Sequence, residues 1–424
     1  MKRYGLLLLG TIAAGLAWTA LVFLTLSEGW LRSPIAESDD PQAFVAAAEA
    51  EASANNRGNL VFVMIEGGQL AASFDLSKGE PVDGDTLFQV ASLGKWLTAW
   101  GVMRLVEEGR IDLDVPVSTY LSRWQLPPGE FNPEGVTVRR LLSHTAGLDD
   151  GLGYDGFASP QDRQTLEDSL TRATDASPGK SGTIALGSEP GSQWQYSGGG
   201  YTLLQLVVEE VTGDSFAAYM DGAVFDPLGM DRTTFDHERA LALGLAQNFR
   251  PDGTTEPLRW YTALAATSLF TTANDLARFL QAQGPDASQP VLSHDTLDLI
   301  ATPHAAQMGA DIWGLGAMLY APGDRGGFVI GHDGQNDPAI NTAARIYPAT
   351  GDGIVILSTG HGSIATELAG EWVFWKTGKV DNLDFAAGIP TMLTWLAVGL
   401  GVIVLLAIFI GIRMRRRGLR GGDR

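Results

Sequence analysis

The chain has 424 residues, 45% of them hydrophobic, and it contains no cysteine. The absence of cysteine excludes disulfide bonds, thiolate catalysis and cysteine-based zinc sites. The formal net charge of −20 argues against nucleic-acid binding, which needs a basic surface. The six histidines are scattered and no HExxH sequence occurs, so we expect neither a metal ion nor another cofactor.

The first 32 residues predict an N-terminal transmembrane anchor. Lys2 and Arg3 are basic, and residues 4–27 carry no charge and are dominated by Leu, Ala, Val and Phe. That length is enough to cross a bilayer as a helix. A cleaved signal peptide is the alternative, but its apolar region is normally shorter, so we expect an uncleaved anchor. Residues 33–58 then form a linker and an Ala/Glu-rich helix.

Residues 59–384 predict the main folded domain. Apolar runs at 60–65 and 71–75 flank Gly67 and Gly68, as expected for a β-hairpin. Strands at both ends of the domain with helices between them predict an α/β (α+β) fold with a helical insert over about residues 110–290. The later β-type runs lie at 328–330, 339–346 and 353–357, and helical periodicity is found at 92–109, 136–142, 201–211, 215–224 and 274–283.

A second uncharged apolar stretch covers residues 385–412 and predicts another transmembrane helix. The tail that follows, residues 413–424, is rich in arginine. Because positive charges favour the cytoplasmic side, we expect both termini in the cytoplasm and the acidic domain outside it. The sequence therefore predicts a protein of the plasma (inner) membrane that contacts the lipid bilayer through two spans.

Ser92 and Lys95 lie three residues apart at the start of a helix with an apolar face. Residues with this spacing share a helix face, so the amine is expected beside the hydroxyl. A buried amine with a lowered pKa can take the proton of a serine and make the oxygen nucleophilic. The alternative interpretation is a helix-capping serine followed by a solvated lysine. The same spacing recurs at Ser177 and Lys180, where Pro178 and Gly179 indicate a surface loop instead.

Several short patterns follow one another along the domain. They are Thr86-Leu-Phe88 with Ser92-Leu-Gly-Lys95, Glu107-Glu-Gly-Arg-Ile-Asp-Leu-Asp114, Leu141-Leu-Ser-His-Thr-Ala-Gly-Leu148, Pro190-Gly-Ser-Gln-Trp194 with Tyr196-Ser197, Pro227-Leu-Gly-Met230 and Gly331-His-Asp-Gly334. This ordered set resembles the class C β-lactamase-related serine hydrolases, a family with penicillin-binding-type D-amino-acid peptidases and esterases. The resemblance runs from about residue 60 to residue 359. It implies an antiparallel sheet flanked by helices, with an all-helical region beside it and the nucleophile between the two.

The resemblance also implies roles for individual residues. Ser92 is the expected acylated nucleophile, Lys95 its proton acceptor, and Tyr196 the tyrosine that shares general acid/base work with the lysine. The family asparagine that follows this tyrosine is replaced by Gly198, which removes an amide and permits more backbone states. Efficient turnover of β-lactams is therefore not expected.

His332-Asp333-Gly334 stands where most relatives have Lys-Thr-Gly, and it is expected between two β runs. A neutral imidazole can donate one hydrogen bond but lacks a fixed charge for a substrate carboxylate. The backbone N–H of Gln335 is the candidate second oxyanion donor beside that of Ser92. A literal Lys376-Thr377-Gly378 also occurs, but it reads as the end of a helix.

His144 could suggest a Ser-His triad, but no G-x-S-x-G sequence occurs, so we interpret it as a turn residue. Trp194, Tyr154 and Trp313 are expected either in the pocket wall or in the core. The resulting hypothesis is a membrane-anchored serine hydrolase that forms an acyl-enzyme with an ester or amide. Its substrate would be a small molecule or peptide: a peptide ending in a D-amino acid, a small ester or a β-lactam. The alternative is a catalytically weak acyl-trapping sensor or a membrane scaffold with the same fold.

Overall fold

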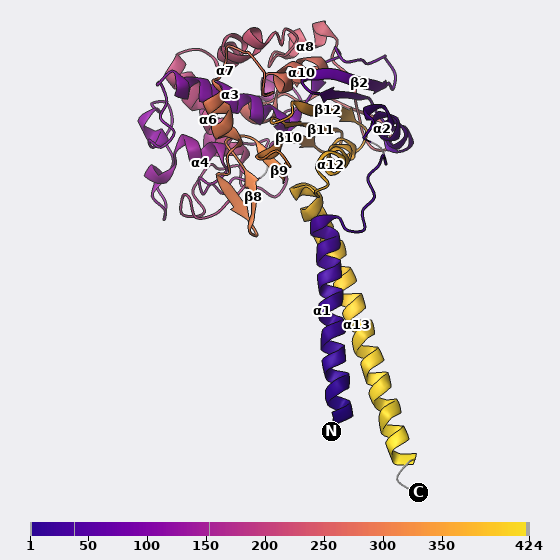
Figure 1. Ribbon diagram of the computed structural model, residues 1–424. Helices are drawn as coiled ribbons and strands as arrows, with labels where there is room; N and C mark the ends of the chain where they lie inside the picture. Colours follow the sequence, from indigo (N-terminus) through magenta and orange to yellow (C-terminus); the bar gives the residue numbers. More distant parts are fainter. Residues whose placement is uncertain (1, 38, 152, 421–424) are drawn as a thin grey trace.

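The computed structural model describes residues 2–37, 39–151 and 153–420. Within them, the central element is an eight-stranded antiparallel sheet with the strand order β2-β1-β12-β11-β10-β9-β8-β7 (Figure 1). The two ends of the domain meet in this sheet, because β1 pairs with β12 from Leu60↔Ser358 to Ile65↔Gly353. The strands are β1 Leu60–Glu66, β2 Gln69–Leu76, β7 Ala305–Gln307, β8 Ala310–Trp313, β9 Met318–Pro322, β10 Phe328–Asn336, β11 Ile340–Tyr347 and β12 Asp352–Thr359.

One face of the sheet is covered by α2 (Pro41–Asn55) and α12 (Ile364–Thr377). Phe44 of α2 and Trp372 of α12 are fully buried there against Phe62 of β1. Phe62 also stacks on Phe74 of β2, with ring centroids 4.8 Å apart. In β1 and β12, every second apolar side chain enters this layer and the others enter the layer on the opposite face.

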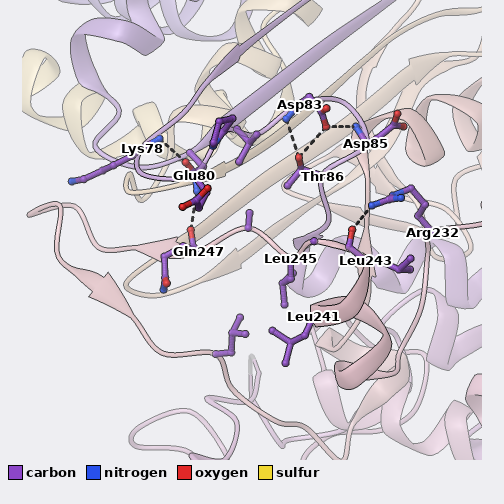
Figure 2. A pocket seen from close by; sticks show the side chains of 16 residues that line it. Lys78, Glu80, Asp83, Asp85, Thr86, Arg232, Leu241, Leu243, Leu245 and Gln247 are labelled. Carbon is purple, nitrogen blue, oxygen red and sulfur yellow. Dashed lines mark hydrogen bonds between the residues drawn. The ribbon is translucent and has the colours of Figure 1, made fainter.

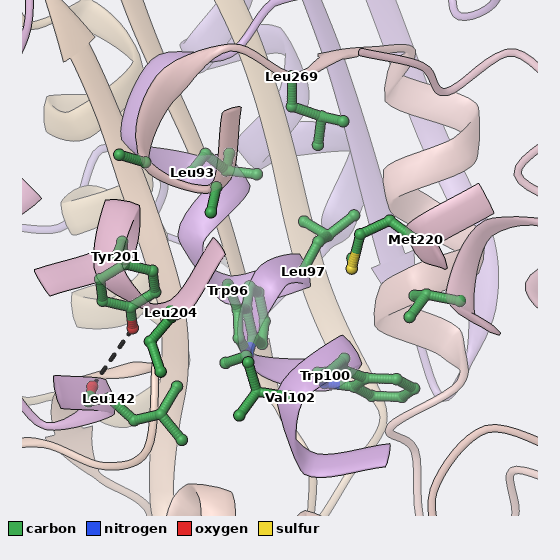
Figure 3. Close-up of a cluster of buried hydrophobic side chains, with 14 of the residues drawn as sticks. Leu93, Trp96, Leu97, Trp100, Val102, Leu142, Tyr201, Leu204, Met220 and Leu269 are labelled. Atoms are coloured by element: carbon green, nitrogen blue, oxygen red, sulfur yellow. Dashed lines mark hydrogen bonds between the residues drawn. The ribbon is translucent and has the colours of Figure 1, made fainter. Parts of the chain in front are cut away.

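The other face is covered by α3 (Gly94–Glu107) and α10 (Ala273–Gln281). Trp96 and Trp100 of α3 hold Phe279 of α10 between them, with ring centroids 4.9 and 4.8 Å apart. Figure 3 shows both tryptophans surrounded by Leu204, Met220 and other side chains of the helical region. Since α3 packs against the sheet on one side and this region on the other, it is buried along nearly its whole length.

The helical region contributes the remaining elements. Its longest helix, α6 (Gly198–Thr212), begins where Ser197 accepts a hydrogen bond from the N–H of Gly200, and ends at Gly213, whose φ is +80°. The other helices of the chain outside the apolar ends are α4 Val138–Leu142, α5 Leu166–Arg172, α7 Phe216–Met220, α8 His237–Leu243, α9 Leu264–Thr267 and α11 His294–Ala301. Single turns and short strands join them: η1 Ala91–Leu93, η2 Val117–Thr119, η3 Pro133–Gly135, η4 Pro160–Asp162, η5 Asp221–Phe225, η6 Asp226–Leu228, β3 Phe88–Gln89, β4 Asn248–Phe249, β5 Thr255–Glu256 and β6 Phe270–Thr271.

Two long helices, α1 (Lys2–Glu28) and α13 (Asn382–Arg420), lie side by side and project away from the domain (Figure 1). The indole Nε1 of Trp18 donates to the carbonyl of Trp395 at 3.1 Å, which ties the two helices together. Both are long and apolar enough to cross a membrane, and their outward apolar side chains are not covered by the domain.

The structure agrees with the predicted antiparallel sheet between helical layers and corrects two details. Residues 88–89 form β3, which pairs with β6 and not with the main sheet as expected. His332 lies inside β10 and not between two β runs, because the β10–β11 ladder continues from Ile330↔Ile346 to Asn336↔Ile340. Polar residues and glycines interrupt the apolar pattern there without interrupting the backbone pairing.

Candidate active site

Ser92 occupies the turn η1, between β3 and the first residue of α3. The preceding residue, Ala91, has a φ of +49°, which is an unfavourable conformation for a residue with a Cβ. The turn is held by Thr342 of β11, whose hydroxyl donates to the carbonyl of Val90 at 2.9 Å. Ser92 itself is half-buried, at the edge of a packed region.

The amine of Lys95 is buried next to Ser92, with Nζ 3.0 Å from Oγ. A second hydrogen bond runs from Nζ to the carbonyl of Ala266 at 2.6 Å. Burial lowers the pKa of Lys95 to about 7, while the more distant carboxylate of Asp150 raises it. A large fraction of the amine is therefore neutral near pH 7 and can accept the proton of Ser92.

Tyr196 lies close to the amine, and Lys95 Nζ is 5.1 Å from the centre of its ring. Burial raises the pKa of Tyr196, and a hydrogen bond with Ser92 opposes this shift only in part. The phenol consequently keeps its proton in the neutral range and can donate a hydrogen bond or a proton. In these protonation states, the amine of Lys95 can accept a proton and the phenol of Tyr196 can donate one.

Asp150 is a buried carboxylate at this site that the sequence reasoning missed. Its carboxylate accepts hydrogen bonds from the hydroxyl of Ser197 and from the N–H of Gly199, the latter at 2.5 Å. It thereby fixes the turn that follows Tyr196, at the positive end of the α6 dipole. The only signal in the sequence is an acidic pair after the Leu141–Leu148 pattern, and such a pair in a Gly-rich loop normally indicates a solvent-exposed turn.

The glycines that follow Tyr196 are closely packed, although the sequence led us to expect greater backbone freedom at Gly198. A Cβ on Gly199 would lie 1.9 Å from Ile184 Cδ1 and 2.7 Å from Asp150 Oδ2, so a side chain there would force both neighbours to shift. A Cβ on Gly198 would lie 3.2 Å from the ring of Tyr154. The buried Tyr154 in turn shares a 2.8 Å hydrogen bond with Thr202 of α6. Tyr154 therefore packs against the start of α6 beneath Gly198.

Strand β10 brings His332 close to Tyr196 and Gly334 close to the Ser92 turn. A Cβ on Gly334 would lie 2.0 Å from the carbonyl oxygen of Val90, so only glycine allows β10 to approach the Ser92 turn this closely. His332 is fully buried, with its ring 6.4 Å from that of Tyr196 and 5.5 Å from that of Trp313. Gln335 is exposed and pairs with Asn341 of β11.

The protonation of His332 follows from its surroundings. Burial lowers its pKa to about 3, and the nearby amine of Lys95 adds to the shift, so the ring is neutral. Its Nδ1 lies 2.6 Å from the carbonyl oxygen of Asp333, which can only accept, so we assign the proton to Nδ1. Nε2 then carries a lone pair, and among the described residues it has no hydrogen-bond partner. The free nitrogen of His332 is therefore an acceptor and not the donor expected from the sequence.

His144 supports Tyr196 from behind. It adopts a φ of +56°, its Nδ1 accepts the N–H of Ser197 at 3.2 Å, and its ring lies 4.3 Å from that of Tyr196. Burial lowers the pKa of His144 well below its usual value, so this ring is also neutral. The position agrees with a turn residue. Trp313 packs in the core behind these rings, whereas Trp194 is half-buried at their edge.

The structure brings Ser92, Lys95 and Tyr196 together and places β10 beside them. The literal Lys376-Thr377-Gly378 sequence lies elsewhere. Lys376 lies on α12, where its Nζ bonds to Glu66 at 2.5 Å and to Asp352 at 3.2 Å. A separate groove of about 660 Å³ lies between the loop that carries Lys78 to Thr86 and the segment around Leu243 (Figure 2). None of the predicted site residues lines that groove.

Comparisons with known proteins agree with the fold. Esterase EstB of Burkholderia gladioli is 34% identical over 191 residues, which are 44% of this chain and 47% of the esterase. Penicillin-binding protein 4* of Bacillus subtilis (strain 168) is 33% identical over 171 residues, 39% of this chain and 34% of that protein. The matched segments thus span less than half of these two relatives. The octameric penicillin-binding protein homologue from Pyrococcus abyssi shares the fold, with a TM-score of 0.65 and 24% identity over 80% of this chain and 77% of that one. The Beta-lactamase family profile matches residues 45–373, and the chain accordingly belongs to the β-lactamase family of serine hydrolases.

Proposed function

We propose that the protein hydrolyses an ester or amide through an acyl-enzyme on Ser92. The neutral amine of Lys95 takes the proton of Ser92, whose Oγ attacks the substrate carbonyl. The N–H groups of Ser92 and Gln335 stabilise the oxyanion, and Tyr196 gives a proton to the leaving group. The protonated amine of Lys95 then returns its proton to the phenolate of Tyr196. A water molecule attacks the acyl group and gives its proton to Lys95, which passes it to the departing Oγ of Ser92. The observation that carries the proposal is the buried amine 3.0 Å from the serine hydroxyl.

The hydrogen bonding of His332 favours a substrate without a carboxylate beside the scissile bond. Its Nδ1 is engaged by the carbonyl of Asp333, and the nitrogen that remains is an acceptor. A lone pair repels a carboxylate, whereas it can accept a hydrogen bond from a hydroxyl or an amide N–H. We therefore propose a neutral ester or amide as the preferred substrate, ahead of β-lactams and of peptides with a free C-terminal carboxylate. The name of the esterase relative agrees with this preference.

We also propose that α1 and α13 anchor the protein in the plasma membrane with both termini in the cytoplasm. The long apolar surfaces of the two helices have no cover in the described part of the chain, and arginines follow the second apolar stretch. The acidic domain would then act outside the cytoplasm. Protease added to intact cells should digest the domain while leaving tags at both termini protected. Digestion of either tag would contradict this topology.

The test of the catalytic proposal compares substrates on the full-length, detergent-solubilised protein and its Ser92→Ala variant. A panel of p-nitrophenyl esters, D-amino-acid amides, D-peptides with free carboxylates and a chromogenic β-lactam separates the substrate classes. Turnover that depends on Ser92 and is highest for neutral esters or amides is the expected result. Equal or faster turnover of the carboxylate-bearing substrates would contradict the role of His332.

The alternative of an acyl-trapping sensor is distinguished by the lifetime of the adduct. A fluorescent penicillin or a fluorophosphonate that labels Ser92 reports the reactivity of the serine. With a p-nitrophenyl ester, a hydrolase releases p-nitrophenol continuously, whereas a sensor stops after one equivalent. A single burst without steady turnover would replace the hydrolase proposal by the sensor.

A further inference from the structure

A largely buried ionic cluster lies behind β10, on the face of the sheet opposite Ser92. Arg345 of β11 is completely buried, and its guanidinium binds Asp381, also completely buried, and Asp333 of β10 at 3.1 Å. Tyr320 of β9 completes the cluster: its ring lies 3.8 Å from the guanidinium carbon, and its hydroxyl donates to Asp333 at 2.6 Å. The hydrolytic mechanism uses none of these side chains.

The cluster is directly connected to the active site through β10. Asp333 follows His332 in the strand, and successive side chains of a strand point to opposite faces. The pairing agrees: Asp333 stands opposite Ala343, which packs with α2 and α12, while His332 stands opposite Ala344, which packs with α3. The carbonyl of Asp333 also receives Nδ1 of His332 at 2.6 Å. A shift of Asp333 therefore moves the backbone that holds the imidazole.

On its other side, the cluster is connected to both long helices. Asp381 immediately precedes α13 and accepts the N–H of Asp384 within it at 2.8 Å. Asp384 binds Arg32, which follows α1, at 2.7 Å, and Arg32 also binds Glu371 of α12 at 2.8 Å. A continuous series of contacts thus runs from the ends of α1 and α13 through Arg345 to the strand that carries His332.

Burying three charges is costly, and apolar residues of the same volume often stabilise a core equally well or better. The ion cluster is thus a poor device for stability alone, but its hydrogen bonds define one position of β10. The position of β10 matters because Gly334 approaches the Ser92 turn so closely that no side chain fits between them. We propose that Arg345 and Asp381 are positioning residues, which hold His332 and Gln335 in register with Ser92 and make turnover dependent on the docking of α13. This inference rests on the proposed hydrolytic function.

The test uses the full-length protein with a p-nitrophenyl ester as the substrate. Asp381→Asn keeps the shape of the side chain but removes the charge that faces Arg345. Loss of alignment is expected to lower kcat by about 10- to 100-fold with little change in KM. The matched control is Asp275→Asn, which removes another buried carboxylate, paired with Arg278 at 2.7 Å on α10. That control is expected to lower Tm without a comparable loss of kcat.

A triple variant, Asp333→Leu with Arg345→Met and Asp381→Leu, separates positioning from stability. If the cluster positions β10, this variant folds with a Tm close to or above that of the wild type while kcat stays low. A folded triple variant or folded Asp381→Asn with wild-type kcat would overturn the proposal. So would the failure of both variants to fold, because the cluster would then be a requirement for folding.

The failure of the proposed function is distinguishable from the failure of this inference. Wild-type protein without Ser92-dependent turnover would refute the function. The positioning of His332 by the ionic cluster would then be measured from the ring ¹⁵N chemical shifts of His332, assigned with His332→Gln. A change in these shifts in Asp381→Asn but not in Asp275→Asn supports positioning, and unchanged shifts refute it.

Discussion

The chain carries the same serine-lysine spacing twice, and only one copy has the geometry of a catalytic pair. Lys95 is buried at the start of α3, with its amine 3.0 Å from the hydroxyl of Ser92. Lys180 is exposed in a turn in which its own N–H binds the carbonyl of Ser177 at 3.1 Å. The difference teaches that the motif has no chemistry of its own: the chemistry comes from burial, which removes the preference of the amine for its charged form.

The largest expected contrast concerns the two serines. Ser92→Ala should lower kcat/KM for the best ester by at least about 10⁴-fold, because no nucleophile remains. Ser177→Ala should leave kcat/KM within a factor of two of the wild type, as expected for a surface turn. Steady-state kinetics on the two purified variants measures the contrast. Equal losses in both variants would mean that Ser92 is not the nucleophile.

The next contrast concerns the two lysines. Lys95→Met should lower kcat/KM by about 10² to 10⁴-fold, because a positioned base contributes an effect of this size. Lys180→Met should be neutral. In the wild type, the acid limb of kcat/KM should lie near pH 7, where Lys95 loses its proton. A pH–rate profile without a limb in this region would remove Lys95 as the base.

Tyr196→Phe tests the proton donor without changing the packing of the ring. We expect kcat to fall by about 10² -fold, with a smaller loss for esters that have good leaving groups, because these need less protonation. The measurement is a comparison of p-nitrophenyl and alkyl esters of one acid. An equal loss for both leaving groups would assign Tyr196 to the attack step and not to departure.

Lys95→Met should also make the folded protein more stable. Below about pH 7 the lysine is protonated in the folded and the unfolded chain, so the folded state carries the whole cost of burying a cation. Between about 7 and the usual 10.5, only the unfolded chain holds the proton, and this cost disappears as pH rises. The variant should therefore gain of the order of 2–5 kcal/mol at pH 6, partly offset by the lost hydrogen bond to Ala266, and much less at pH 10. Denaturation at both pH values measures the gain, and the absence of a pH-dependent difference would contradict it.

The smallest expected effect is that of replacing Asp150, whose carboxylate acts on the amine of the buried Ser92/Lys95 pair. Its charge raises the pKa of Lys95, so Asp150→Asn should move the acid limb of kcat/KM to lower pH. The rate on the plateau should fall by less than about tenfold, provided that Ser197 still caps α6. A shift to higher pH would mean that the carboxylate does not act on the amine through its charge.

The fold and the family followed from local patterns, and both predictions were confirmed by the structure and the comparisons. Helix and strand boundaries failed where the local signal was mixed, as in β10, which the sequence pattern ended at residue 330 but whose ladder continues to Asn336. The proton of His332 could not be predicted, because it depends on a contact between Nδ1 and the backbone carbonyl of its neighbour. The roles of Ser92, Lys95 and Tyr196 stay predictions until the variants are measured.

The order of motifs along the chain was enough to identify the family resemblance and the candidate nucleophile, and the resemblance implied the antiparallel sheet. Such motifs can be read from the sequence because each involves only a few neighbouring residues. Only the tertiary structure decided how completely the amine of Lys95 is buried, that Asp150 acts on its charge, and that Arg345 joins β10 to α13. Those properties arise between residues that are distant in the sequence, and burial, which sets charge and hydrogen bonding, depends on everything that packs around a side chain.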